Sequence, residues 1–280
     1  MALFIAAWED EGGRLAREGK DWIFVSDAHF TGREQEGMRT FLRFLDLEKP
    51  SLAHLVILGD LFEFLFDFKI GLSRRVRSLE ERVFPFSDYL PVFEKLKSLE
   101  ESNIRITYGE GNHDFCLRTF FRDQLRMKVE VHPKGWEEKL GNRKVFLAHG
   151  DLSNPRQWRY RLFRKALKNP LTYGLMRWAG PRVCQRVARG MSEKSRLHYH
   201  QPLLESGLEV FRQFARQRFK EGFDVVILAH SHFPEALSEE VGERSCFYFN
   251  LGDWMVHRSY LRFSPPDTFV LRRFEEEASR

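Results

Sequence analysis

The stretch VVILAHSHFP, residues 225–234, joins a run of apolar residues to two histidines that stand one residue apart. Five apolar residues without a break are typical of a strand that is buried on both faces. His230 and His232 follow directly, and alternate residues of an extended chain project to the same side. The stretch therefore predicts a central strand whose end presents two imidazoles together.

Five other stretches are built in the same way, each an apolar run rich in Val, Ile and Phe that stops at a polar cluster. They are WIFVSDAHF (22–30), HLVILGDLFEF (54–64), IRITYGEGNHDF (104–115), KVFLAHGD (144–151) and FYFNLGDW (247–254). Helical patterns, such as those of residues 38–47 and 89–102, lie between them. Alternating strands and helices predict a layered α/β fold, in which ligands bind beyond the carboxyl ends of the strands.

The cysteine content and the first residues of the sequence favour a protein of the cytoplasm. Cys116, Cys184 and Cys246 have no paired spacing, so neither a disulfide framework nor a cysteine-based zinc site is expected. The opening MALFIAAWEDEGG contains only a short apolar run with no basic residue before it, which is unlike a secretory signal. No later stretch is long enough to span a bilayer.

The positive charge of the chain is concentrated in one segment. The net charge is +5, but residues 156–196 hold twelve Lys or Arg and a single acidic residue, so the rest of the chain is net negative. We predict that residues 153–205 form an inserted, basic, amphipathic helical cap over a core made of residues 1–152 and 206–280. Such a field attracts phosphates, nucleic acid or an anionic membrane surface, and a solvated helical surface is the plainer alternative.

Helical spacing divides the start of this cap into two faces. The apolar face consists of Trp158, Leu162, Phe163, Ala166 and Leu167, and the basic face consists of Arg159, Arg164, Lys165 and Lys168. The apolar face is suited to an acyl-binding groove or a membrane surface, and packing against the core is the plainer alternative. The Phe-rich region 62–86 is a candidate for a wall of the same groove.

The polar residues at the strand ends are of the types that bind metal ions. They are Asp27, His29, Asp60, Asn112, His113, Asp114, His149, His230 and His232. The set contains carboxylates, imidazoles and an amide oxygen but no thiolate, which favours manganese, iron or zinc. Each residue alone is more often a rim or turn residue, but five such clusters at strand ends favour a metal centre. The ligands are too many for one ion and suit two ions that share a carboxylate.

The order of these clusters resembles the signature of the calcineurin-like metallophosphoesterases, D-x-H, G-D, G-N-H-D/E, H and G-H-x-H. Here the motifs read Asp27–Ala28–His29, Gly59–Asp60, Gly111–Asn112–His113–Asp114, His149 and Ala229–His230–Ser231–His232. Ala229 is a departure, since the family usually has Gly there. The resemblance spans roughly residues 22–254 and implies a calcineurin-like layered α/β/β/α sandwich with an inserted helical cap.

The same resemblance implies a centre of two divalent metal ions, with Mn²⁺ as the expected ion. One ion would be held by Asp27, His29, Asp60 and His232, and the second by Asp60, Asn112, His149 and His230. Such a pair lowers the pKa of a bridging water, which attacks phosphorus, and neutralises the phosphate oxygens. His113 would face the leaving-group oxygen as a general acid or charge stabiliser, and Asp114 would orient it.

Four further stretches resemble the UDP-2,3-diacylglucosamine diphosphatases of lipid A biosynthesis. They are GDLFEF (59–64), the run from HGD to YRLFRKALKNP (149–170), MSEKSR (191–196) and NLGDW (250–254). The resemblance implies hydrolysis of the pyrophosphate of a lipid-linked nucleotide sugar, UDP-2,3-diacylglucosamine, to UMP and 2,3-diacylglucosamine 1-phosphate (lipid X). It also implies a cytoplasmic enzyme attached peripherally to the anionic inner-membrane surface of a Gram-negative bacterium.

Two departures indicate a divergent branch of this group. The best-known branch has Arg at the position of His113, and it has an acidic pair where this chain reads SNPRQW (153–158). Candidate contacts with the substrate phosphates or sugar are Asn112, His113, Arg156, Lys165, Ser192, Ser195 and Arg196.

The main alternative is a metal-dependent phosphodiesterase that acts on nucleic acid or nucleotides. Residues 156–196 would then contact backbone phosphates, and binding would weaken steeply with salt. In this segment, however, basic residues alternate with Leu, Val and Met at helical period, and aromatic residues for base stacking are few. A protein-binding scaffold of the same fold is a third possibility, but a scaffold has no need for seven metal ligands.

Overall fold

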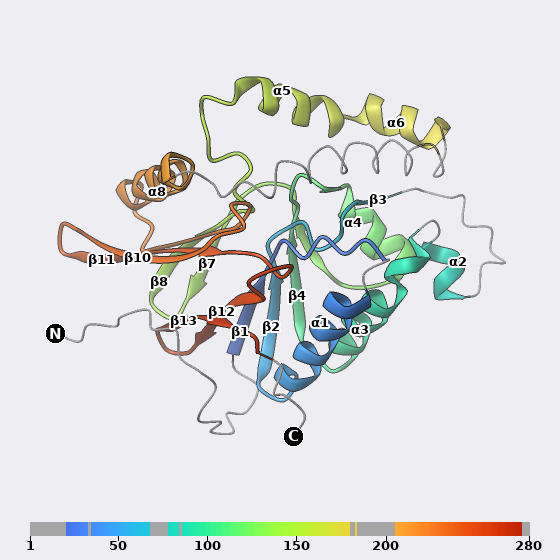
Figure 1. Cartoon of the computed structure of the whole chain (residues 1–280), viewed down its shortest axis with the longest axis horizontal. Helices are drawn as coiled ribbons and strands as arrows, with labels where there is room; N and C mark the ends of the chain where they lie inside the picture. The colour runs from blue at the N-terminus through green and yellow to red at the C-terminus, as the bar shows by residue number, and fades with distance from the viewer. Residues whose placement is uncertain are drawn as a thin grey trace.

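The computed structural model describes residues 21–32, 35–67, 78–83, 86–179, 183 and 205–275. At its centre two β-sheets lie face to face (Figure 1). The first has six strands in the order β13-β12-β1-β2-β4-β6. They are β1 Asp21–Val25, β2 Leu52–Ile57, β4 Arg105–Gly109, β6 Glu130–His132, β12 Ser259–Ser264 and β13 Thr268–Arg273. β1, β2, β4 and β6 are parallel, and β12 pairs antiparallel with both β1 and β13.

The second sheet has five strands in the order β10-β11-β9-β8-β7. They are β7 Trp136–Leu140, β8 Arg143–Leu147, β9 Val225–Leu228, β10 Pro234–Val241 and β11 Arg244–Leu251. β8, β9 and β11 are parallel, whereas β7 and β10 pair antiparallel at the two edges. A separate short pair is formed by β3 Leu65–Phe66 and β5 Asp114–Phe115.

Helices cover the outer faces of both sheets. α1 Gln35–Glu48 and α3 Leu90–Glu101 pack on the first sheet, and α8 Glu205–Lys220 packs on the second. Short helical segments are α2 Leu79–Val83, the 3₁₀ turn η1 Ser87–Tyr89, α4 Leu117–Thr119 and the π-helical η2 Phe120–Leu125. Three buried clusters mark the layers, one under α1 and α3, one between the sheets around Val56 and Ile227, and one under α8 around Phe211. This layering confirms the predicted α/β/β/α sandwich.

The strands that carry the predicted ligand clusters are the central parallel ones. β1, β2 and β4 are neighbours in the first sheet, and β8 and β9 are neighbours in the second. Val225–Leu228 is buried throughout, as the continuous apolar run predicts. Because parallel strands end at one edge of their sheet, the loops that follow them come together there.

α5 Trp158–Leu167 and α6 Pro170–Ala179 run outside both sheets, along the top of the view in Figure 1. The expected alternative that the apolar face of this region packs against the core is wrong for its start. Trp158 and Leu162 are each 61% exposed, whereas Arg164 is only 9% exposed. Part of the basic face turns inward, because Arg164 meets the buried carboxylate of Asp151 at 2.5 Å, whereas Arg159 and Lys165 of the same face are exposed. No helix in the described part of the chain is long and apolar enough to cross a membrane.

The sequence predicts that the Phe-rich region 62–86 forms a wall of the groove, but the structure places three of its phenylalanines in the core. Phe62, Phe66 and Phe86 are buried in the core cluster under α3, where Phe62 lies 5.1 Å from the ring of Phe93. Residues 68–77 and 84–85 of the same region are outside the described part of the chain.

Candidate metal centre

The structure brings the seven predicted ligands together at the carboxyl ends of five strands. Asp27 and His29 follow β1, Asp60 follows β2, Asn112 follows β4, His149 follows β8, and His230 and His232 follow β9. Two groups of ligand atoms are made entirely of these residues, one by Asp27, His29 and His232 and the other by Asp60, His149 and His230, and within each group the atoms lie within 4.8 Å of one another. A third such group in the described residues, made by His29, Glu63 and His113, shares His29 with the first.

Five of these residues have a left-handed backbone. The φ angles at Asp27, His29, Asp60, His230 and His232 are +50°, +45°, +53°, +69° and +59°. This conformation is uncommon for residues with a side chain, costs free energy and is concentrated at functional sites. The sequence pattern assumed an extended chain at Asp27–His29 and at His230–His232. The structure instead has left-handed residues at both places, and this backbone geometry aims the ligands.

Glycines allow the ligand loops to touch one another. Gly59 has φ +85°, and a Cβ placed on it would lie 2.7 Å from His149 Nδ1. A Cβ on Gly111 would overlap Asp60 Oδ1. The glycines of these two motifs are therefore required by close packing. Ala229, which replaces a family glycine, is not among the described residues with positive φ, so alanine is compatible with the backbone there.

In the first group, three potential ligand atoms surround one point. Asp27 Oδ1 lies 3.7 Å from His29 Nε2 and 3.6 Å from His232 Nε2. These separations exceed those of good hydrogen bonds. Asp27 Oδ1 is buried, and no hydrogen bond reaches it from the described residues. A buried carboxylate oxygen faced by two imidazoles at this spacing fits a cation held between them.

In the second group, Nε2 of His149 faces three atoms at the same distance. It lies 3.1 Å from Asp60 Oδ2, 3.1 Å from Asn112 Oδ1 and 3.1 Å from His230 Nδ1. His149 Nδ1 donates to the carbonyl oxygen of Leu58 at 2.7 Å, so Nε2 of the neutral imidazole presents a lone pair. The oxygens of Asp60 and Asn112 present lone pairs as well. Lone pairs that converge in this way fit a divalent metal ion.

Buried charges shift the pKa values in this cluster. Burial alone would lower the pKa of His149, but the charge of Asp60 raises it to about 10. Burial also opposes the charged form of His29, yet the neighbouring carboxylates of Asp27 and Glu63 raise its pKa to about 10. In the opposite direction, burial and the neighbouring His149 lower the pKa of His230 to about 4. Protons and metal ions therefore compete for the same nitrogen atoms.

His113 lies beside the first group. Its ring centroid is 4.7 Å from that of His29, at nearly a right angle. The Nδ1 atom donates to the carbonyl oxygen of Glu63 at 2.7 Å, because a carbonyl can only accept. Nε2 is therefore the nitrogen that can exchange a proton with a substrate.

The expected role of Asp114, orienting the ring of His113, is corrected by the structure. The Asp114 carboxylate accepts from the amides of Asp60 and Gly111, at 3.1 and 2.9 Å, and from the Tyr108 hydroxyl at 3.1 Å. Burial and the charge of Asp60 raise its pKa to about 7. These contacts hold the loop between β4 and β5, and the ring of His113 is held by a backbone carbonyl instead.

Two acidic residues that the sequence pattern did not single out stand behind the ligands. Glu63 Oε2 lies 3.6 Å from His29 Nδ1, and Asp253 Oδ2 lies 3.8 Å from His232 Nδ1. Carboxylates in such positions orient ligand imidazoles and increase their basicity. Glu63 lies in GDLFEF and Asp253 in NLGDW, two of the stretches that resemble the diphosphatases. The motifs therefore contained these residues, but they did not indicate that the carboxylates orient ligand histidines.

Of the four candidate substrate contacts that the structure describes, two lie at the site and two do not. Asn112 and His113 lie at the site, whereas Arg156 and Lys165 are exposed at the start and on the outside of α5. The remaining candidates, Ser192, Ser195 and Arg196, lie outside the described residues.

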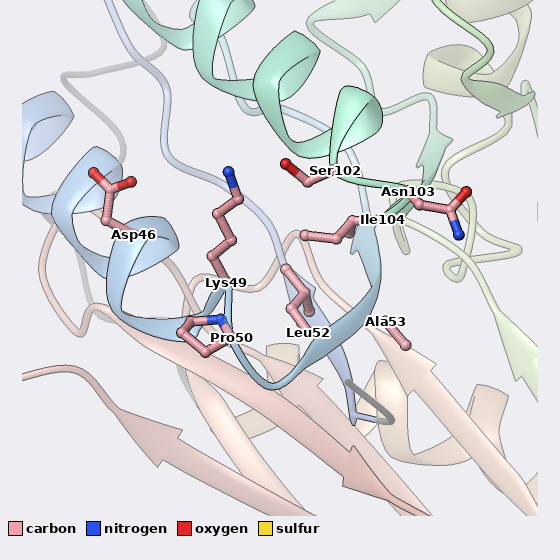
Figure 2. A pocket seen from close by; sticks show the side chains of 8 residues that line it. All are labelled: Asp46, Lys49, Pro50, Leu52, Ala53, Ser102, Asn103 and Ile104. Carbon is pink, nitrogen blue, oxygen red and sulfur yellow. The ribbon is translucent and has the colours of Figure 1, made fainter. Parts of the chain in front are cut away.

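Two cavities lie at different ends of the strands. One of about 310 Å³ borders His149 and is lined by Lys134, Arg161 and Arg218, among others. The other, of about 670 Å³, lies between the ends of α1 and α3 and the amino-terminal ends of β2 and β4 (Figure 2). Ligands of α/β sheets bind beyond the carboxyl ends of the strands. The cavity beside His149 is therefore the one that adjoins the candidate site.

The chain belongs to the calcineurin-like phosphoesterase family, whose profile matches residues 22–234. It is 28% identical to UDP-2,3-diacylglucosamine hydrolase of Stenotrophomonas maltophilia over 253 residues, which cover 86% of this chain and 93% of that protein. The enzyme of the same name from Yersinia pseudotuberculosis is 28% identical over 241 residues, covering 86% and 93%. Among solved structures, Vps29 of Chaetomium thermophilum is similar over 88% of this chain and 82% of its own, at 12% identity and a TM-score of 0.41.

Proposed function

We propose that this protein hydrolyses the pyrophosphate of UDP-2,3-diacylglucosamine and releases UMP and 2,3-diacylglucosamine 1-phosphate (lipid X). The similarity to the Stenotrophomonas enzyme supports this substrate because it extends over 86% of the chain. At the site, the observation that carries the proposal is the convergence of three potential ligand atoms on Nε2 of His149, each at 3.1 Å. Such a site suits phosphate chemistry that is assisted by metal ions.

The residues of the chain have separate tasks in this reaction. Two bound divalent ions supply an activated water and neutralise the phosphate oxygens. We assign Asp60 to both ion positions, because its Oδ2 lies 3.1 Å from His149 Nε2 in the second group and its charge also helps to raise the pKa of His29 in the first group. His113 donates a proton from Nε2 to the leaving-group oxygen, since Nδ1 is already bound to the carbonyl of Glu63.

We propose Mn²⁺ as the ion at both positions. The donor set of oxygens and imidazole nitrogens without a thiolate suits manganese. Adding Mn²⁺, Mg²⁺, Zn²⁺ or Ca²⁺ separately to the metal-free protein tests this choice. The highest rate is expected with Mn²⁺, and a higher rate with Zn²⁺ at equal occupancy would contradict it.

The region of residues 153–205 is proposed to be a cap on a core of residues 1–152 and 206–280. Its helix α6 turns large apolar side chains outward, since Leu171 and Trp178 are each 86% exposed. Exposed cations, Arg156 and Lys165, lie in and beside α5. An apolar face with neighbouring cations fits a membrane surface that contains anionic lipids. We therefore propose a cytoplasmic enzyme that works peripherally at the inner membrane of a Gram-negative bacterium.

Product analysis with Mn²⁺ tests the proposed reaction. UDP-2,3-diacylglucosamine and bis-p-nitrophenyl phosphate are offered separately, with an Asn112→Ala variant as control for contaminating activity. Release of UMP and lipid X by the natural sequence alone is the expected result. Hydrolysis of the nitrophenyl ester without any UMP release would exclude the lipid substrate and favour a general phosphodiesterase.

Two cations of the basic region are not available to a nucleic-acid backbone, which makes nucleic acid the weaker candidate substrate. Arg164 and Lys168 are paired with the acidic residues Asp151 and Glu110 rather than presented to a phosphate backbone. Arg156 and Lys165 remain exposed, and if they bound a nucleic-acid backbone, the binding would weaken steeply with salt.

A further inference from the structure

A lysine at the end of α5 reaches from the cap into the ligand loops. Lys168 Nζ lies 2.9 Å from the carbonyl oxygen of Gly111, 2.9 Å from that of Asp114 and 3.3 Å from Glu110 Oε2. An ammonium group has three donors and no acceptor. All three donors of this side chain are therefore directed at one loop, the loop that follows β4.

The two carbonyl groups bracket the residues with proposed chemistry. Gly111 and Asp114 flank Asn112, a potential metal ligand, and His113, the proposed proton donor. Lys168 thus bridges the two ends of this four-residue turn. Bonds to both ends restrict how far the intervening side chains can move, because the carbonyls on either side share one donor group.

The third acceptor of Lys168 is itself fixed in the core. Glu110 is 6% exposed, and its Oε1 accepts from the amide of Leu117 at 2.9 Å. The charges of Lys168 and Glu110 are both largely buried, with side-chain exposures of 14% and 4%. Removing one partner of such a pair leaves the other charge buried and uncompensated, which is costly.

Lys168 is the last member of a polar stripe on α5. Tyr160, Arg164 and Lys168 are spaced four residues apart and therefore share one helical face. The Tyr160 hydroxyl donates to Asp151 Oδ2 at 2.9 Å, and Arg164 Nε lies 2.5 Å from the same oxygen. Asp151 follows His149 by two residues. The stripe therefore touches both the loop that carries Asn112 and the loop that carries His149.

We propose that Lys168 is a positioning residue, through which the cap holds Asn112 and His113 in their reactive arrangement. The role deepens the proposed function, since it concerns the same site and assumes that these two residues act there. Its consequence is specific. The cap then affects the reaction even for a substrate that has no lipid part and makes no use of the exposed face of α5 and α6.

Three variants test this role on bis-p-nitrophenyl phosphate. Lys168→Met removes the donors and keeps the length of the side chain. Lys168→Arg keeps the charge but cannot place one nitrogen among three acceptors. Arg159→Met is the matched control, because it removes a cation from an exposed position of the same helix whose guanidinium lies over the neighbouring Trp158 ring.

We expect Lys168→Met to lower kcat by about 10- to 100-fold, as for outer residues that orient metal ligands. KM for the small ester is expected to change much less. The affinity for Mn²⁺, measured by calorimetry without substrate, is expected to fall in the same variant. Lys168→Arg is expected to lose about 3- to 10-fold in kcat, and Arg159→Met to behave as the natural sequence.

The proposal is wrong if folded Lys168→Met has the same kcat and the same Mn²⁺ affinity as the protein with the natural sequence. A lower melting temperature with those two values unchanged would show that Lys168 only docks the cap. If Lys168→Met does not fold, kcat and the Mn²⁺ affinity are measured on Lys168→Arg, and unchanged values there contradict the proposal. Because the ester lacks the lipid, absence of UMP release from UDP-2,3-diacylglucosamine would reject the proposed substrate without affecting this test.

Discussion

The ligand loops and the proposed cap have opposite relations between polarity and burial. At the strand ends, Asp27 and Asp60 are completely buried, and their oxygens face other potential ligands. On the cap, Trp178 and Leu171 are each 86% exposed to solvent. Clustered carboxylates in the interior and apolar side chains on the surface both cost free energy. Each region therefore has the form expected for the role that we propose for it, a cation site at the strand ends and a membrane-facing surface on α6.

The largest effect is expected from the shared carboxylate. Asp60→Ala removes the residue assigned to both ion positions, so we expect the hydrolysis rate to fall by about 10⁴-fold or more. Mn²⁺ binding, followed by calorimetry, is expected to weaken at the same time. A variant that bound two ions normally and still hydrolysed the ester would contradict the role of Asp60.

His113→Ala separates binding from catalysis within the ligand loops. Its side chain is outside the proposed ligand sets, so both ions are expected to bind as before. Loss of the proton donor is expected to lower kcat by about 10²- to 10⁴-fold. Calorimetry with Mn²⁺ and steady-state kinetics on the ester measure the two properties. Near-normal kcat would show that the leaving group needs no proton from His113.

The pH dependence of metal binding probes the buried charges directly. The pKa of His149 in the metal-free protein is raised from 6.5 to about 10, so its proton must leave before an ion binds. We expect the Mn²⁺ affinity to rise with pH between these values, by about tenfold per pH unit for each displaced proton. Titrations in buffers of different ionisation enthalpy count the protons released. A pH-independent affinity would exclude this competition.

The same shift affects the stability of the metal-free protein. A raised pKa means that protonated His149 contributes its full stabilisation below pH 6.5 and loses it as the pH rises through about 10. The melting temperature of the metal-free protein is therefore expected to decline over this range. With Mn²⁺ bound, the decline attributable to His149 is expected to disappear.

The smallest effect on chemistry is expected from the exposed face of the cap. Leu171→Glu with Trp178→Glu removes two apolar side chains and adds negative charge. Partition onto phosphatidylglycerol vesicles is expected to fall by about tenfold or more, while turnover of the soluble ester stays unchanged. Gln213→Glu with Gln217→Glu puts the same charges on exposed positions of α8 as a control. Equal partition of both variants would show that this face does not bind the membrane.

Much of the core could be predicted because its signals are local. The apolar runs that became β1, β2, β4, β8, β9 and β11 are continuous in sequence and end at polar clusters. The strands β12 and β13 gave no such signal. Their place depends on pairing between residues that are far apart in the sequence, for example Trp22 and Phe263. A local sequence pattern does not show which distant strand a segment pairs with.

The proposed cap shows what a sequence pattern cannot predict, namely which face of a helix turns inward. The spacing of its apolar and basic residues predicts an amphipathic helix, and α5 confirms the helix. The direction of its faces depends on what the helix meets. Asp151 and Glu110 lie beneath α5 and compensate Arg164 and Lys168, so the charged stripe turns inward, against the usual preference of apolar residues for the interior.

The sequence by itself determined the chemical types of the ligands and the strand ends that carry them, since both are written in short contiguous motifs. Only the tertiary structure decided which lone pairs converge, which residues take left-handed turns and what stands behind the imidazoles. The amide of His230 donates to Asp27 Oδ2 at 3.1 Å across more than two hundred residues of chain. Such a contact exists because two sheets pack face to face, and that packing depends on the whole core rather than on any one motif.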